Sequence, residues 1–246
     1  MGQKKSHFII FGLLVLVLAL FGWTLSTQMQ VSKLEKTVLT VHRQFRYKGD
    51  EHNASLSIPL TQYLHYQEKA RPSWLNYPYS HPYHFFAEYA AMATDPDDDA
   101  TIDNVVGYLD EVAASEGFND YEKIEFALVF VQSFTYIGDN ITGTLDEYPR
   151  YPVETLFDRE GDCEDTSILL AAILNEMDYD VAMLLFEEFD HIGLGVNMPP
   201  GYKVFGNSWI YEDRRYWYLD TSGGKSIGWC PEPYDVTSAY VYPIGG

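Results

Sequence analysis

The pattern of apolar and polar positions separates a continuous hydrophobic segment near the N-terminus from a longer region with the periodicities of helices and strands. Residues 8–23 are almost purely apolar and follow Lys4 and Lys5. With its uncharged flank the segment is long enough to cross a bilayer as a tilted helix, and no A-x-A cleavage motif follows it. We therefore predict a cytoplasmic head and an uncleaved transmembrane signal anchor over residues 1–30, with the remaining chain outside the cytoplasm.

Residues 31–100 are predicted to form a stalk followed by a small β and loop region. Apolar residues recur at spacings of three and four from Val31 to Phe45, which favours an amphipathic helix that continues from the anchor. Residues 55–60 alternate between apolar and polar side chains, as a strand does. Residues 71–86 are rich in Pro, Tyr and His, a composition typical of an irregular loop.

The helical part of the predicted domain over residues 101–246 comes first. One amphipathic helix ends at Gly117, and a second begins with a capping box formed by Asn119 and Glu122. A third helix is apolar on all sides over residues 168–174, so we expect it to be buried on most sides.

Strand-like segments follow the third helix. They cover residues 181–186, 191–196, 208–211 and 216–220, with turn-forming residues between them. Helices followed by an antiparallel meander are typical of an α+β fold. We expect the third helix to pack on this antiparallel sheet.

The composition is that of a folded, acidic protein. Apolar residues make up 46% of the chain, and the formal net charge is -20. Such a charge argues against binding to nucleic acid, because that binding depends on basic side chains that displace counterions from phosphates. Cys163 and Cys230 are the only cysteines in the sequence, which indicates no disulfide framework but leaves one bridge between them open.

Cys163 is the first candidate for a reactive group. It directly precedes the buried helix, where free backbone N–H groups and the helix dipole lower the pKa of a thiol. A thiol nucleophile also needs a base and a group that orients the base. His191 opens one predicted strand and Asp220 ends another, so adjacent antiparallel strands can bring the carboxylate beside the imidazole. Gly193 and Gly195 share a face with His191 and leave it bare, which favours close approach of the Cys163 helix or a substrate.

Four stretches of the chain resemble the transglutaminase-like superfamily, a group of cysteine enzymes with the papain fold. They are Gly161-Asp162-Cys163-Glu164-Asp165, residues 190–196, residues 216–221, and residues 148–156 ahead of the cysteine. The chain is most similar to archaeal and bacterial membrane-anchored members. The resemblance implies a papain/transglutaminase-like core and a cysteine hydrolase that acts on peptide or isopeptide bonds outside the cytoplasm.

The resemblance also implies roles for individual residues. Cys163 would attack an amide carbonyl, His191 would pair with the thiolate, and Asp220 would hold the tautomer of the imidazole. The second oxyanion donor is a tryptophan in animal transglutaminases, and the stretch ahead of Cys163 lacks one at the corresponding place. Gln132 or Tyr136 is expected to replace it.

Calcium is a further implication of the resemblance. Bacterial calcium-dependent relatives bind the metal through acids that flank the cysteine, and Asp162 and Glu164 match those positions. From the residues alone, a helix cap and solvated acids explain this pair better, so no cofactor is required. Because these acids oppose thiolate formation, we expect a cationic His191 to lower the pKa of the thiol.

Two alternative functions stay open at this point. One is a protein-glutamine transamidase, in which an amine and not water resolves the thioester. The other is a catalytically inactive envelope module in which Cys163 is bridged to Cys230. The expected partners are a protein or peptide substrate and the membrane that holds residues 1–30.

Overall fold

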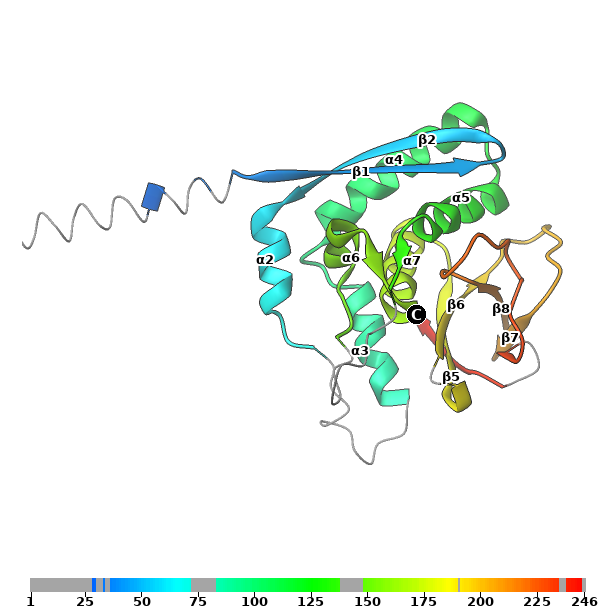
Figure 1. The fold of residues 1–246 in the computed structure, drawn as a ribbon. Helices are drawn as coiled ribbons and strands as arrows, with labels where there is room; N and C mark the ends of the chain where they lie inside the picture. The colour runs from blue at the N-terminus through cyan, green and yellow to red at the C-terminus, as the bar shows by residue number, and fades with distance from the viewer. Residues whose placement is uncertain are drawn as a thin grey trace, which may run out of the picture.

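The computed structural model describes residues 28–29, 33, 36–71, 83–137, 148–189, 191–234 and 238–244. An N-terminal hairpin lies across a group of helices, and an antiparallel sheet packs on their other side (Figure 1). The predicted transmembrane segment over residues 8–23 lies outside the described residues. Within the described parts of the chain, no helix combines the length and the apolar character needed to cross a membrane.

The N-terminal hairpin consists of β1 (Val38–Tyr47) and β2 (Asp50–Pro59), which pair antiparallel. The prediction of a helical stalk that reaches Phe45 was therefore wrong from Val38 onward. Val41 and Phe45 are both buried and lie four residues apart, a spacing that fits a strand as well as a helix. The turn between the strands holds Lys48 at φ 51° and Gly49 at φ 98°, the positive values that a tight two-residue hairpin needs.

Four helices follow the hairpin: α2 (Leu60–Glu68), α3 (Tyr83–Ala93), α4 (Asp99–Glu116) and α5 (Asp120–Gln132). The predicted irregular loop over residues 71–86 was wrong from Tyr83, where α3 begins. The end of α4 at Gly117 is confirmed, since this residue closes the helix with φ 70°. The capping box of α5 is also confirmed, because the Asn119 side chain accepts from the Glu122 N–H at 3.1 Å and Glu122 accepts from the Asn119 N–H at 2.9 Å.

The helix α7 (Cys163–Glu176) lies at the centre of the fold. It packs against α3, α4, α5 and α6 (Pro152–Asp158) and against the sheet. A short parallel pair, β3 (Thr135–Tyr136) and β4 (Glu160–Gly161), precedes it. All of its residues from Asp165 to Leu174 are buried, which confirms the prediction of a helix covered on most sides.

The sheet contains five antiparallel strands in the order β7-β8-β6-β5-β9. Their bounds are β5 (Val181–Phe186), β6 (His191–Asn197), β7 (Ser208–Tyr211), β8 (Arg214–Leu219) and β9 (Tyr240–Ile244), and a 3-10 turn, η2 (Glu187–Phe189), follows β5. The four predicted strands are confirmed, whereas β9 was not foreseen. The fold is therefore a mixed one, in which α7 packs on an antiparallel sheet.

Both faces of this sheet are apolar. One face meets α7 through alternate residues such as Met183, Leu194 and Leu219. The opposite face forms a second small core that includes Leu184 and Tyr218. Burial on both sides explains why β5 is an uninterrupted apolar run and not an alternating one.

Candidate functional site

Cys163 is held in place by the first turn of α7. The Asp162 side chain caps the helix by accepting from the Asp165 N–H at 3.4 Å. Asp165 in turn receives a hydrogen bond of 2.9 Å from the Arg150 guanidinium. A Cβ on Gly161 would lie 2.6 Å from the Cβ of Asp165, so only glycine allows this close approach before the cysteine. The backbone of Cys163 is thereby fixed from both sides.

The thiol of Cys163 has two polar neighbours. It donates a hydrogen bond of 3.2 Å to the Glu164 carboxylate, and the backbone N–H of Ile192 on β6 is close enough to act on its pKa. Burial, followed by the charge of Glu164, raises the pKa of the thiol, and the Ile192 N–H only partly opposes this. This direction is opposite to the lowered thiol pKa that the helix end predicted, because burial and the adjacent acids disfavour the thiolate.

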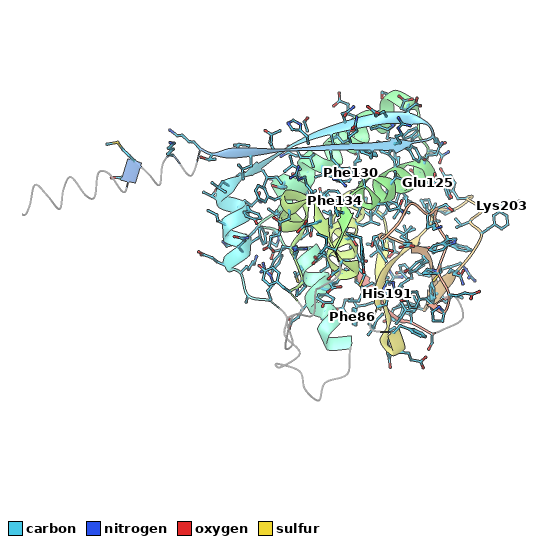
Figure 2. All side chains as sticks on the ribbon, in the orientation of Figure 1. Phe86, Glu125, Phe130, Phe134, His191 and Lys203 are labelled. Atoms are coloured by element: carbon cyan, nitrogen blue, oxygen red, sulfur yellow. The ribbon has the colours of Figure 1, made fainter. Side chains whose placement is uncertain are left out.

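His191 is the first residue of β6 (Figure 2). Its Nε2 lies 3.0 Å from the hydroxyl of Tyr218 on β8. The Tyr234 ring stacks on the imidazole with a centroid separation of 4.4 Å and an interplanar angle of 8°. Burial lowers the pKa of His191, and the charge of Asp220 opposes this in part. Burial therefore favours the neutral imidazole, whereas a cationic ring was expected.

Asp220 directly follows β8 and is 5% exposed. Its Oδ1 accepts from the backbone N–H of Ser222 at 2.9 Å and from the Ser222 hydroxyl at 2.6 Å. In this structure the thiol of Cys163 bonds to Glu164 and the imidazole of His191 bonds to Tyr218, while Asp220 acts on His191 through its charge.

The two proposed oxyanion donors differ in their surroundings. Gln132 donates from Nε2 to the carbonyls of Asp220 at 2.7 Å and Lys225 at 2.9 Å, so in this conformation it braces the loop after β8. Tyr136 is 49% exposed. Burial of its ring edge, together with the charge of Cys163, raises the pKa of Tyr136 to about 12, so its hydroxyl keeps a hydrogen to donate.

The face of β6 that carries Gly193 and Gly195 is filled, not bare. A Cβ on Gly193 would lie 2.5 Å from Cε2 of Tyr218, and one on Gly195 would lie 2.7 Å from the Cβ of Tyr216. This face is turned away from α7, so the prediction that the helix or a substrate approaches it was wrong. Sequence reasoning missed Tyr218 as a partner of His191, although the alternation of β8 places Tyr218 on the same side as Asp220.

The acids beside Cys163 interact with other groups of the protein in this arrangement. Asp162 caps α7, Glu164 accepts the thiol hydrogen, and Asp165 pairs with Arg150. Calcium takes six to eight oxygen ligands. Among the residues that the structure describes, no group of three or more His, Cys, Asp and Glu side chains is arranged to hold a metal ion. Calcium binding through Asp162 and Glu164 therefore stays a prediction.

Cys230 is the other cysteine near this site. Cys163 and Cys230 are both free thiols, so the bridge considered as an alternative is not formed in this structure. Both thiols lie close enough to Tyr218 and Tyr234 for their charges to act on the two phenols. Cys230 therefore provides a natural control for reactions of Cys163.

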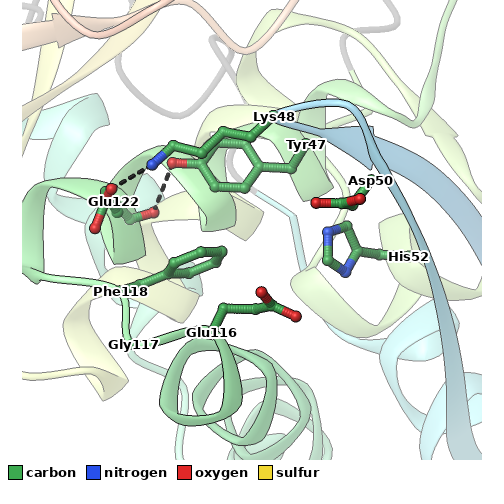
Figure 3. Close-up of a pocket in the computed structure, with 8 residues that line it drawn as sticks. All are labelled: Tyr47, Lys48, Asp50, His52, Glu116, Gly117, Phe118 and Glu122. Carbon is green, nitrogen blue, oxygen red and sulfur yellow. Dashed lines mark hydrogen bonds and ion pairs between the residues drawn. The ribbon is translucent and has the colours of Figure 1, made fainter.

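A cavity of about 250 Å³ lies at the far end of the hairpin, between its turn and the junction of α4 and α5 (Figure 3). It is lined by Tyr47, Lys48, Asp50, His52, Glu116, Gly117, Phe118 and Glu122. Lys48 is paired with Glu122 across it. None of the residues around Cys163 contributes to this lining, so the cavity is separate from the candidate site.

No protein-family model matches the chain, and no curated protein matches its sequence. Among solved structures, the calcium-bound form of Legionella pneumophila LapG matches with 21% identity and a TM-score of 0.33, over 56% of this chain and 83% of that chain. The EGTA-treated form matches with 21% identity and a TM-score of 0.31, over 56% of this chain and 78% of that chain. Similarity as limited as this shows neither a family nor an activity, so the function must be argued from the residues around Cys163.

Proposed function

We propose that the chain is a membrane-anchored cysteine hydrolase of the transglutaminase-like type. Cys163 is the nucleophile, His191 is the general base, and the Asp220 carboxylate orients the imidazole. The observation that carries the proposal is that the backbone N–H of Ile192, the residue after His191, acts on the Cys163 thiol. This interaction links the start of α7 to the start of β6 and supports a site that contains both a thiol and an imidazole.

The protonation states suggest how the reaction starts. Burial favours a neutral thiol and a neutral imidazole, so His191 removes the thiol proton as the sulfur attacks, and no ion pair is needed beforehand. Glu164 must first release the thiol hydrogen, which requires only a rotation of its side chain. The carbonyl oxygen then gains negative charge, and the Cys163 N–H and the Tyr136 hydroxyl are the proposed donors to it.

The second half of the reaction restores the enzyme. The imidazolium of His191 returns its proton to the leaving amine, the C–N bond breaks, and a thioester remains on Cys163. His191 then takes a proton from water, which attacks the thioester and releases the acid and the free thiol. No step uses a metal or an organic cofactor. The proposed substrate is a protein or peptide outside the cytoplasm, with residues 1–30 holding the enzyme at the membrane.

An activated ester tests the assignment of the nucleophile. With excess p-nitrophenyl acetate we expect a burst of about one equivalent of p-nitrophenolate, as acylation of a thiol produces. Cys163→Ala should abolish the burst, and Cys230→Ala, the matched loss of the other free thiol, should retain it. A burst that survives Cys163→Ala would exclude this residue as nucleophile.

The same acyl-enzyme distinguishes hydrolysis from transamidation. If water is the normal acceptor, addition of a primary amine such as a dansylated cadaverine should leave acetate as the main product. Predominant transfer to the amine would instead support the transamidase alternative. Absence of any burst in the wild-type chain would favour the inactive-module alternative.

A further inference from the structure

We infer that Tyr218 is a positioning residue for His191, and that the main role of the Asp220 charge is to orient the Tyr218 hydroxyl. The inference rests on the proposed function, because it concerns how His191 is prepared to accept the thiol proton. In this arrangement the Nε2–H of His191 donates to the Tyr218 oxygen, and Nδ1 keeps the lone pair that takes the proton from Cys163.

The Tyr218 ring is fixed tightly enough to position a partner. It is 1% exposed and packs edge-on against Phe186 at a centroid distance of 6.0 Å and Trp209 at 5.8 Å. Gly193 supplies the space for it, since a Cβ there would lie 3.0 Å from the Tyr218 hydroxyl oxygen. The hydroxyl is thereby held 3.0 Å from Nε2 of His191.

Asp220 is placed to act on this hydroxyl. Asp220 directly follows β8, two residues after Tyr218, and its charge reaches the Tyr218 hydroxyl. Its charge, after burial, is the largest influence that raises the pKa of Tyr218, and it also acts on His191. The negative charge draws the phenol hydrogen toward Asp220 and leaves the phenol oxygen as an acceptor for Nε2–H.

A phenol suits this position because it both donates and accepts. When the thiol proton moves from sulfur to Nδ1, the Nε2–H bond to the Tyr218 oxygen is retained and strengthens as the ring becomes positive. The phenol itself gains and loses no proton. Without the hydroxyl, the imidazole is free to carry its hydrogen on Nδ1 instead, and that tautomer cannot take the thiol proton.

Tyr218→Phe removes only the hydroxyl and keeps the ring that packs in the second core. We expect the rate constant of the p-nitrophenyl acetate burst at saturating ester to fall by about tenfold or more, with the half-saturating ester concentration nearly unchanged. Tyr216→Phe is the matched control. It also removes a hydroxyl from a fully buried ring on the same strand and face. The Tyr216 hydroxyl donates a hydrogen bond of 2.9 Å to Asp180 and not to His191.

A double-mutant cycle tests the link to Asp220. Asp220→Asn keeps an oxygen for Ser222 and removes the charge. If Asp220 acts through Tyr218, Asp220→Asn should slow the burst in the wild-type background and cause less than about a twofold further loss in the Tyr218→Phe background. Equal losses in both backgrounds would overturn the link, and a Tyr218→Phe burst as fast as that of Tyr216→Phe would overturn the positioning role.

Failure of the inference is distinguishable from failure of the proposed function. In the first case the wild-type burst is present and depends on Cys163, but Tyr218→Phe does not slow it. In the second case the burst is absent from the wild-type chain or persists in Cys163→Ala. Thermal unfolding of all variants separates a loss of folded protein from a loss of rate.

Discussion

Replacement of Gly193 by alanine should damage both stability and chemistry, because the added Cβ would lie 2.5 Å from Cε2 of Tyr218. Non-bonded carbon atoms prefer separations of about 3.5 to 4.0 Å, so the Tyr218 ring must move by about 1 Å. The ring is fully packed, and overpacking of this kind costs about 1 to 3 kcal/mol. Such a shift also breaks the hydrogen bond to His191, which adds about 1 kcal/mol.

The sum is a loss of about 2 to 4 kcal/mol in the free energy of unfolding. At roughly 2 to 4 °C per kcal/mol for a domain of this size, the melting temperature should fall by about 4 to 16 °C. Circular dichroism of the full chain measures this shift. The burst rate constant with p-nitrophenyl acetate, measured well below the melting temperature, should fall by about tenfold, since His191 loses the same partner as in Tyr218→Phe.

Gly195→Ala is the matched control, because its added Cβ would lie 2.7 Å from the Cβ of Tyr216 on the same face. It should lower the melting temperature by a similar amount and leave the burst rate within about twofold, since Tyr216 bonds to Asp180 and not to His191. A Gly193→Ala variant that melts like the wild type, or a Gly195→Ala variant that loses as much burst rate, would refute the reasoning.

Three further predictions concern charged side chains. Glu164→Gln removes a carboxylate that raises the pKa of Cys163. Alkylation of Cys163 by iodoacetamide at neutral pH should therefore accelerate by about tenfold for each unit by which the pKa of the thiol falls. The control variant Glu160→Gln, on β4, should leave this rate unchanged. Asp98 is 2% exposed, and burial with the charges of Asp95 and Asp99 raises the pKa of its carboxyl to about 8. The folded state therefore keeps a proton that the unfolded state loses above about pH 4, and the free energy of unfolding should fall as the pH rises from there to about 8. Urea unfolding should show a steeper fall in the wild type than in Asp98→Asn, where Asp165, with a pKa raised by burial to about 7, still contributes. Equal pH dependence in both would contradict the assignment to Asp98. EGTA should leave the burst of Cys163 unchanged, and a loss that added calcium restores would show that Asp162 and Glu164 bind metal in solution.

Local sequence signals were sufficient for much of the fold. The capping box of Asn119 and Glu122 and the left-handed Gly117 are recognisable because each depends on neighbours a few residues away. The apolar run of α7 predicted a buried helix for the same reason. The strand β1 was predicted as a helix, because the four-residue spacing of Val41 and Phe45 fits the period of a strand as well as that of a helix. The turn at Lys48 and Gly49 was the sequence signal that indicated a hairpin instead.

The site was less accessible to sequence reasoning because its contacts join distant parts of the chain. Cys163, His191 and Asp220 were singled out by their residue types and positions, but their hydrogen-bond partners depend on how side chains turn in the fold. Tyr218 reaches His191 across neighbouring strands, and Glu164 turns toward the thiol and not toward solvent. The strand β9, which lies far along the chain from its partner β5, depends on the same long-range pairing.

The complete burial of α7 from Asp165 to Leu174 limits which positions of the protein tolerate substitution. Amide hydrogens of such a helix should exchange with solvent only when the whole domain unfolds, so the helix that begins at Cys163 is held rigidly. Under the proposed function, variation in substrate preference must then arise at exposed segments such as Tyr136 on β3 and Phe189 after β5. Substitutions there can alter what the thiol encounters without loosening the scaffold that holds it.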